Sequence, residues 1–133
     1  MSGIDRLLAS SRARLTRVDP DEGAKLVADG ALLIDIRPAA QRAQFGEVPG
    51  AIVIERNVLE WRLCPDGPDR LAEAEDPQRP VVVMCQDGYA SSLAAAALLD
   101  VGRTTATDLA GGFTSWKAAG LPTTPPTVGA DPR

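Results

Sequence analysis

The stretch VVVMCQDGYASS, residues 81–92, decides how the chain is organised. Four apolar residues lead directly into Cys85, polar residues and Gly88 follow, and the next run is LAAAALL at residues 93–99. A short apolar run bounded by turn residues is typical of a buried strand, whereas a run rich in alanine and leucine favours a helix. The sequence therefore predicts a thiol at the junction between a buried strand and the start of a helix.

Short apolar runs and helical patterns alternate along the rest of the chain. Strands are expected at residues 16–18, 31–36, 51–54, 81–84 and 107–109, and helices at residues 4–15, 20–28, 38–45, 57–63, 91–101 and 113–119. This alternation is typical of an α/β fold in which helices cover both faces of a parallel sheet. Sites in such sheets form at the carboxyl ends of the strands, and Cys85 follows such an end.

Length and composition fit one domain. A chain of 133 residues can bury one core and is too short for two ordinary domains, and a hydrophobic content of 44% is typical of globular proteins. We expect a helical extension over residues 1–15, the main domain over residues 16–122, and a flexible tail over residues 123–133, where Pro, Thr and Gly predominate.

The charge pattern and the residue types exclude several classes of function. A net charge of -4 without a basic run argues against a nucleic-acid partner, and no apolar run has the length of a membrane span. The start MSGIDRLLASSRARL lacks the pattern of a signal peptide, so we expect a cytoplasmic protein whose Cys64 and Cys85 are thiols. Because histidine is absent, Cys-His and Ser-His-Asp schemes are excluded, and we expect neither a metal nor an organic cofactor.

The loop after Cys85 can activate a thiol without a histidine. If a helix begins near Ser91, with Ser91 or Ser92 as its cap, its first amides have no partners within the helix and carry a partial positive charge. Gly88 allows the loop to curl so that several amides converge on one point, where a thiolate, a persulfide or an oxyanion is stabilised. The alternative is that Cys85 packs as a small apolar residue, and the local pattern leaves both interpretations open.

Three stretches, in order, resemble the rhodanese (sulfurtransferase) superfamily. They are LLIDIRPAAQRAQFGEVPGAIVI (residues 32–54), VVVMCQDGYASSLAAAALL (residues 81–99) and DLAGGFTSWKAAGLP (residues 108–122). The first resembles the family's Asp-x-Arg strand end and its following Gly-x-x-Pro-Gly-Ala turn, and we expect Asp35 and Arg37 to have a structural role there, as an ion pair or a turn hydrogen bond. The resemblance covers residues 16–122, and three motifs in order are far more specific than one cysteine loop.

The resemblance implies a doubly wound, five-stranded parallel sheet with helices on both faces, to which this chain adds an N-terminal helix. It implies that Cys85 takes a sulfane sulfur from a small donor such as thiosulfate and holds it as a persulfide. The acceptor would be a thiol, cyanide or a protein. The loop residues whose amides would cradle the sulfur are Gln86, Asp87, Gly88, Tyr89, Ala90 and Ser91. The alternative is a sulfur carrier or protein-binding module that turns over poorly by itself.

The charge of the loop departs from the family pattern. Many members carry a basic residue in this loop, whereas this chain has none between Cys85 and Ser92 and has an acidic residue at Asp87. A carboxylate near the thiol would disfavour the thiolate and repel thiosulfate, so we expect a low-molecular-weight persulfide or a protein donor to serve better. The alternative is that Asp87 points into solvent and matters little. Phosphatases that share the fold have an arginine six residues after the cysteine, and this chain has Ser91 there, without a phosphate clamp.

Three further residues have a functional and a structural interpretation. Arg56 and Arg62 follow the strand expected at residues 51–54 on the site's side of the sheet. Either arginine could supply the missing positive charge, or both could be hydrated surface residues. Cys64 could act as a resolving thiol for Cys85, or it could be an incidental, partly buried thiol.

Overall fold

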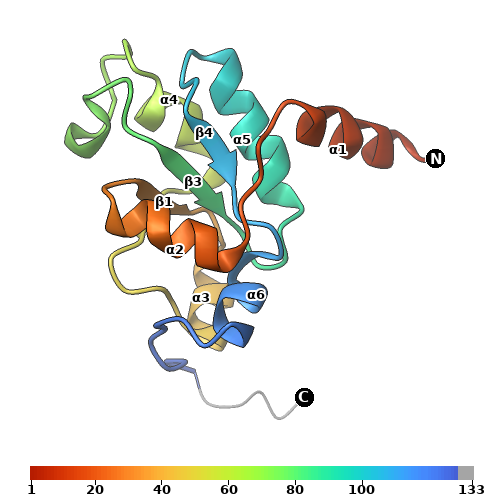
Figure 1. The fold of residues 1–133 in the computed structure, drawn as a ribbon, viewed down its shortest axis with the longest axis vertical. Helices are drawn as coiled ribbons and strands as arrows, with labels where there is room; N and C mark the ends of the chain where they lie inside the picture. Colours follow the sequence, from red (N-terminus) through yellow and green to blue (C-terminus); the bar gives the residue numbers. More distant parts are fainter. Residues whose placement is uncertain (129–133) are drawn as a thin grey trace.

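In the computed structural model, which describes residues 1–128, a parallel sheet lies between two layers of helices (Figure 1). Its strands are β1 (Leu32–Asp35), β2 (Ile52–Val53), β3 (Val81–Met84) and β4 (Ala106–Asp108). The strand order is β2-β1-β3-β4, so β1 and β3 are central, and every residue of these two strands is buried. The doubly wound α/β fold expected from the sequence is confirmed.

Six α-helices and two short 3-10 turns complete the described chain. They are α1 (Gly3–Ala13), α2 (Pro20–Ala28), α3 (Ala39–Phe45), η1 (Arg56–Val58), α4 (Leu59–Leu63), η2 (Ala72–Ala74), α5 (Ala90–Asp100) and α6 (Gly112–Ala118). The start of α2 is a capping box, because the Asp19 carboxylate accepts a bond from the Glu22 amide at 2.8 Å and the Glu22 carboxylate accepts one from the Asp19 amide at 3.1 Å. Across residues 1–128, no helix is both long and apolar enough to span a membrane.

The alternation of side chains along the strands divides the core into two halves. Val83 and Cys85 belong to the half that packs against α5, which contributes the buried Leu98. Val82 belongs to the opposite half, which contains Phe113 of α6. Successive residues of a strand point to opposite faces, so the register of β3 turns the cysteine toward α5.

The fifth strand predicted at residues 16–18 is reduced to one parallel bridge, between Val18 and Leu109. Before Val18, the carbonyl of Thr16 accepts a hydrogen bond from the hydroxyl of Thr107 at 2.7 Å and, within residues 1–128, takes no part in backbone pairing. After Val18, the chain cannot pair further. The amide of Asp19 is bonded to the capping box of α2, and Pro20 has no amide to donate. Strand pairing therefore ends at Val18, and the sheet has four strands with a single bridge at its edge.

The chain after Pro122 runs back along α3. The amide of Thr124 donates to the carbonyl of Glu47 at 2.7 Å, and the amide of Val128 donates to the carbonyl of Ala43 at 3.1 Å. Residues 129–133, the rest of the expected tail, lie outside the described residues. The domain boundaries expected from the sequence stay predictions.

Arg103 holds the long connection between α4 and β3. Its side chain is fully buried, and its guanidinium donates to the carbonyls of Leu63, Ala74 and Asp76 at 3.0, 2.6 and 2.8 Å. Burial lowers the pKa of Arg103 from its ordinary value, while the charge of Asp76 opposes this shift. The guanidinium thus provides hydrogen bonds for three carbonyls that would otherwise be costly to bury.

Candidate active site

Cys85 follows the last residue of β3, where the chain turns toward α5. The residue is 7% exposed, and two backbone amides donate to its sulfur: that of Gly88 at 3.1 Å and that of Ser91 at 3.3 Å. Ser91 lies in the first turn of α5, where amides have no partners within the helix. The sulfur is therefore held by one amide from the loop and one from the helix.

The cysteine loop packs directly on the turn before α6. Gly88 has a φ of +86°, and a Cβ atom added there would lie 2.6 Å from the amide nitrogen of Gly111. The carbonyl of Cys85 accepts a hydrogen bond from the amide of Phe113 at 2.9 Å. The positive φ and the close approach both require glycine at position 88.

Helix α5 begins differently from the sequence prediction. Its first residue is Ala90, its N-cap is Tyr89, and no side chain caps it, so the prediction that Ser91 or Ser92 is the cap is wrong. Both hydroxyls instead donate to one carboxylate oxygen of Asp108 at 2.8 Å. A buried carboxylate at the end of β4 therefore competes for the serine hydroxyls that would cap the helix, and the first amides of α5 are left for the sulfur.

Arg37 connects the end of β1 to the residue after the cysteine. Its buried guanidinium pairs with Asp35 at 2.9 Å, as predicted, and donates to Gln86 Oε1 at 3.0 Å and to the carbonyl of Gly46 at 2.8 Å. It also lies over the ring of Phe113, 4.1 Å from the ring centroid. These contacts fix the orientation of the Gln86 side chain, because a guanidinium donates in fixed directions.

A pocket of about 370 Å³ borders Cys85. Its lining residues are Ile36, Arg37, Pro38, Gln41, Arg56, Cys85, Gln86, Asp87, Tyr89 and Ala90. Arg56 thus lies at the site, although it also pairs with Glu60 at 2.7 Å. Arg62 is not part of this lining, and it donates to the carbonyl of Asp69. Of the two arginines singled out in the sequence, the structure brings only Arg56 to the cysteine.

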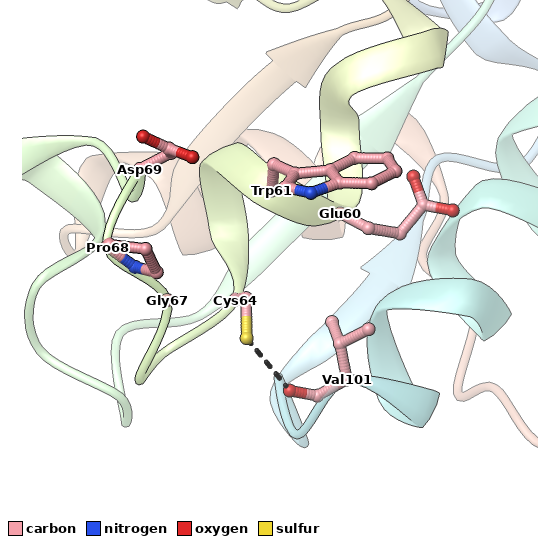
Figure 2. A pocket seen from close by; sticks show the side chains of 7 residues that line it. All are labelled: Glu60, Trp61, Cys64, Gly67, Pro68, Asp69 and Val101. Atoms are coloured by element: carbon pink, nitrogen blue, oxygen red, sulfur yellow. Dashed lines mark hydrogen bonds between the residues drawn. The ribbon is translucent and has the colours of Figure 1, made fainter.

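Cys64 lies in a different pocket, of about 390 Å³, beneath Trp61 of α4 (Figure 2). Its sulfur lies 3.1 Å from a carboxylate oxygen of Asp66 and 3.5 Å from the carbonyl of Val101, and the one thiol proton can be donated to either acceptor. The hydrogen bond to Asp66 raises the pKa of Cys64 from its ordinary value, because it favours the protonated thiol.

The two cysteines lie at opposite ends of α5. Cys85 is bonded by an amide of the first turn, that of Ser91, whereas Cys64 contacts Val101, the C-cap. Ten residues of helix separate these contacts by about 15 Å, and a disulfide requires Cα atoms within about 7 Å. The structure therefore does not bring Cys64 to the position of a resolving thiol.

Asp87 is exposed and points toward α6. Its carboxylate accepts a hydrogen bond from the hydroxyl of Thr114 at 2.8 Å, and the Gln86 amide donates to the same hydroxyl at 3.3 Å. Asp87 nevertheless lines the pocket at Cys85. Its negative charge is exposed to solvent and hydrogen-bonded, but a substrate entering the pocket would pass close to it.

Two arginines that sequence reasoning missed bond the outer side of the loop. Arg12 of α1 and Arg17 each donate to the carbonyl of Gly88 at 2.8 Å. Arg17 also pairs with Asp108 at 2.9 Å. No local signal marks these residues, because arginines on a surface helix or in a connection, such as Arg12 and Arg17, are usually hydrated.

Residues 19–119 match the family model of the rhodanese-like domain, and the chain belongs to this family. The thiosulfate sulfurtransferase GlpE of Pseudomonas savastanoi pv. phaseolicola is 31% identical over 102 residues, which cover 77% of this chain and 87% of that protein. GlpE of Actinobacillus succinogenes is 28% identical over 108 residues, which cover 80% and 88%. The resemblance noted in the sequence is confirmed, and these named relatives are distant sulfurtransferases.

Solved structures show the same fold. A protein of unknown function from Rhodopseudomonas palustris, described as a "possible tyrosine phosphatase", superposes with a TM-score of 0.83 at 25% identity and covers 93% of this chain and 96% of its own. The human single-domain sulfurtransferase TSTD1 superposes with a TM-score of 0.64 at 28% identity and covers 77% and 95%.

Proposed function

We propose that this chain is a sulfurtransferase in which Cys85 carries the transferred sulfur as a persulfide. The supporting observation is the pair of backbone amides, from Gly88 and Ser91, that donate to the cysteine sulfur beside an open pocket. Amides that converge on a sulfur favour an anion there, so they suit both a thiolate and a persulfide. The names of the GlpE relatives support the same reaction class.

The proposed reaction has two displacements. The Cys85 thiolate attacks the outer sulfur of thiosulfate, a new S–S bond forms to the cysteine, and sulfite leaves with the electrons of the broken S–S bond. A thiolate or cyanide then attacks the outer sulfur of the persulfide, and Cys85 leaves as a thiolate. Both steps balance without an external oxidant or reductant, and neither needs a histidine.

The residues around Cys85 have separate proposed roles. The amides of the loop from Gln86 to Ser91 bind the outer sulfur, and Arg37 orients the Gln86 side chain. Asp87 disfavours a doubly charged donor, so a low-molecular-weight persulfide or a protein persulfide is the preferred donor, and a thiol or a protein is the acceptor. Both cysteines are free thiols, which suits the cytoplasm as the compartment.

A second candidate is a sulfur carrier that accepts one sulfur and delivers it to a single protein partner. The absence of a basic residue between Cys85 and Ser92 favours this alternative. Phosphatase activity has less support. Ser91 occupies the position of the phosphate-binding arginine, and its hydroxyl is bonded to the carboxylate of Asp108. A neutral hydroxyl cannot replace a bidentate, charged clamp.

Intact-protein mass spectrometry tests the proposal. The wild type, Cys85→Ser and Cys64→Ser would be incubated with thiosulfate or with glutathione persulfide, and then with cyanide. We expect a gain of one sulfur, about 32 Da, that cyanide removes and that only Cys85→Ser lacks. Repeated turnover would identify an enzyme, and a single loading that stalls would identify a carrier. If no donor adds sulfur to Cys85, the proposed function is wrong.

A further inference from the structure

Arg12 of α1 makes three contacts with the loop and with the start of α5. One guanidinium nitrogen donates to the carbonyl of Gly88 at 2.8 Å, and another donates to the hydroxyl of Ser92 at 3.0 Å. The guanidinium also lies 5.3 Å from the ring centroid of Tyr89, which lines the pocket at Cys85. One side chain from α1 thus contacts three residues of the cysteine loop and of the helix that follows it.

The partners of Arg12 leave its positive charge uncompensated. Arg17, which shares the carbonyl of Gly88, is paired with the buried carboxylate of Asp108 at 2.9 Å. The partners of Arg12 are a carbonyl, a hydroxyl and an aromatic ring, and within residues 1–128 no carboxylate forms an ion pair with it. The two arginines and Asp108 together leave one net positive charge on the outer side of the loop.

This charge lies close to the reactive sulfur. The carbonyl that Arg12 contacts belongs to Gly88, whose amide donates to the sulfur of Cys85 at 3.1 Å. The nitrogen and oxygen of one residue are at most about 4 Å apart, so the guanidinium lies within about 10 Å of the sulfur. At that distance, in a partly buried site, a unit positive charge favours an anion on the sulfur, and salt screens the attraction.

We propose that Arg12 is a positioning residue of the sulfur-transfer site and supplies, from α1, the positive charge that the cysteine loop lacks. The inference rests on the proposed function of Cys85. Arg12 and Arg17 both precede residue 19, where the match to the rhodanese-like domain begins. The segment before the domain match is therefore part of the site, and it stabilises the anionic forms of the cysteine through the Gly88 peptide.

The test compares Arg12→Gln, Arg12→Lys and Arg14→Gln in a Cys64→Ser background. Arg14 is the matched control, because it lies two residues away and pairs with Asp100 on the surface. The measurement is the pH midpoint for alkylation of Cys85 by iodoacetamide, with thermal unfolding to follow stability. We expect Arg12→Gln to raise the midpoint by about 0.5–1 pH unit, Arg12→Lys to raise it by less than half as much, and Arg14→Gln to leave it unchanged.

Two results would overturn the inference. One is an Arg12→Gln midpoint equal to that of Arg14→Gln. The other is an Arg12→Lys midpoint as high as that of Arg12→Gln, which would show that the charge is not what matters. Alkylation does not require sulfur transfer, so this test and the persulfide-loading test fail independently. If the wild type never forms a persulfide, the proposed function is wrong, while the midpoints still report whether Arg12 acts on Cys85.

Discussion

Gly88→Ala would impose two separate costs on the loop that holds Cys85. The φ of +86° lies in the left-handed region, which costs an L-residue roughly 1–2 kcal/mol. The new Cβ would also lie 2.6 Å from the nitrogen and 3.2 Å from the Cα of Gly111. Both atoms are backbone and cannot rotate away, so relief requires the loop to move, at a cost of about 1–3 kcal/mol.

Gly50→Ala is the matched control for the backbone strain. Gly50 has a φ of +84°, and a Cβ added there meets no atom within 4 Å. We therefore expect Gly50→Ala to lower the free energy of unfolding by about 1–2 kcal/mol and Gly88→Ala to lower it by about 2–5 kcal/mol. Movement of the loop also withdraws the Gly88 amide from the sulfur of Cys85, so persulfide formation should slow in this variant alone.

Urea unfolding followed by circular dichroism gives the free energies, provided that the slope with urea is the same for all three proteins. Mass spectrometry at short times after addition of glutathione persulfide gives the rate of loading. The reasoning would be refuted if Gly88→Ala were no less stable than Gly50→Ala. It would also be refuted if Gly88→Ala acquired sulfur as fast as the wild type.

Three other changes have definite expected results. Arg37→Met leaves the carboxylate of Asp35 buried without its partner, so the free energy of unfolding measured in urea should fall by about 3–5 kcal/mol. A fall of less than about 1 kcal/mol would contradict the importance of the buried ion pair. Asp66→Asn removes the carboxylate that raises the pKa of Cys64, so the thiolate fraction of Cys64 at pH 8 should rise. Alkylation of Cys64, measured in a Cys85→Ser background, should then be about threefold faster or more. An unchanged rate would show that Asp66 does not hold the thiol. Asp87→Asn should increase loading from thiosulfate about two- to fivefold and change loading from glutathione persulfide less, because thiosulfate concentrates two negative charges in one small ion whereas the charges of glutathione persulfide are spread over a larger molecule. Equal changes in loading for both donors would show that the charge of Asp87 does not discriminate between them.

The elements of the fold were predictable where the signal is local. The apolar run at residues 81–84 is β3, and the pattern around Asp19 and Glu22 is the capping box of α2. The strand predicted at residues 16–18 forms only one bridge, because the Thr16 carbonyl is bonded to the Thr107 hydroxyl and Pro20, after Val18, has no amide to donate. The contact between Thr16 and Thr107 joins residues 91 positions apart, so no local pattern shows it.

The residues of the candidate site were likewise predictable only where the signal is local. The residues contiguous with Cys85 were found because the loop and the helix start are adjacent in sequence. Arg12 was not found, because its contact with Gly88 spans 76 residues and depends on how α1 packs on α5. The position of Cys64 was equally hidden, because the sequence places it in a loop but does not show that the loop meets the far end of α5.

The contacts of Arg103 have a consequence for local opening of the chain. The connection between α4 and β3 contains only one 3-10 turn, and two of its carbonyls, together with that of Leu63 at the end of α4, are bonded to this one guanidinium. These bonds cannot be lost one at a time at little cost, because a buried guanidinium without acceptors is strongly unfavourable. The connection should therefore exchange its amide hydrogens as one cooperative unit, whose protection depends on a single side chain.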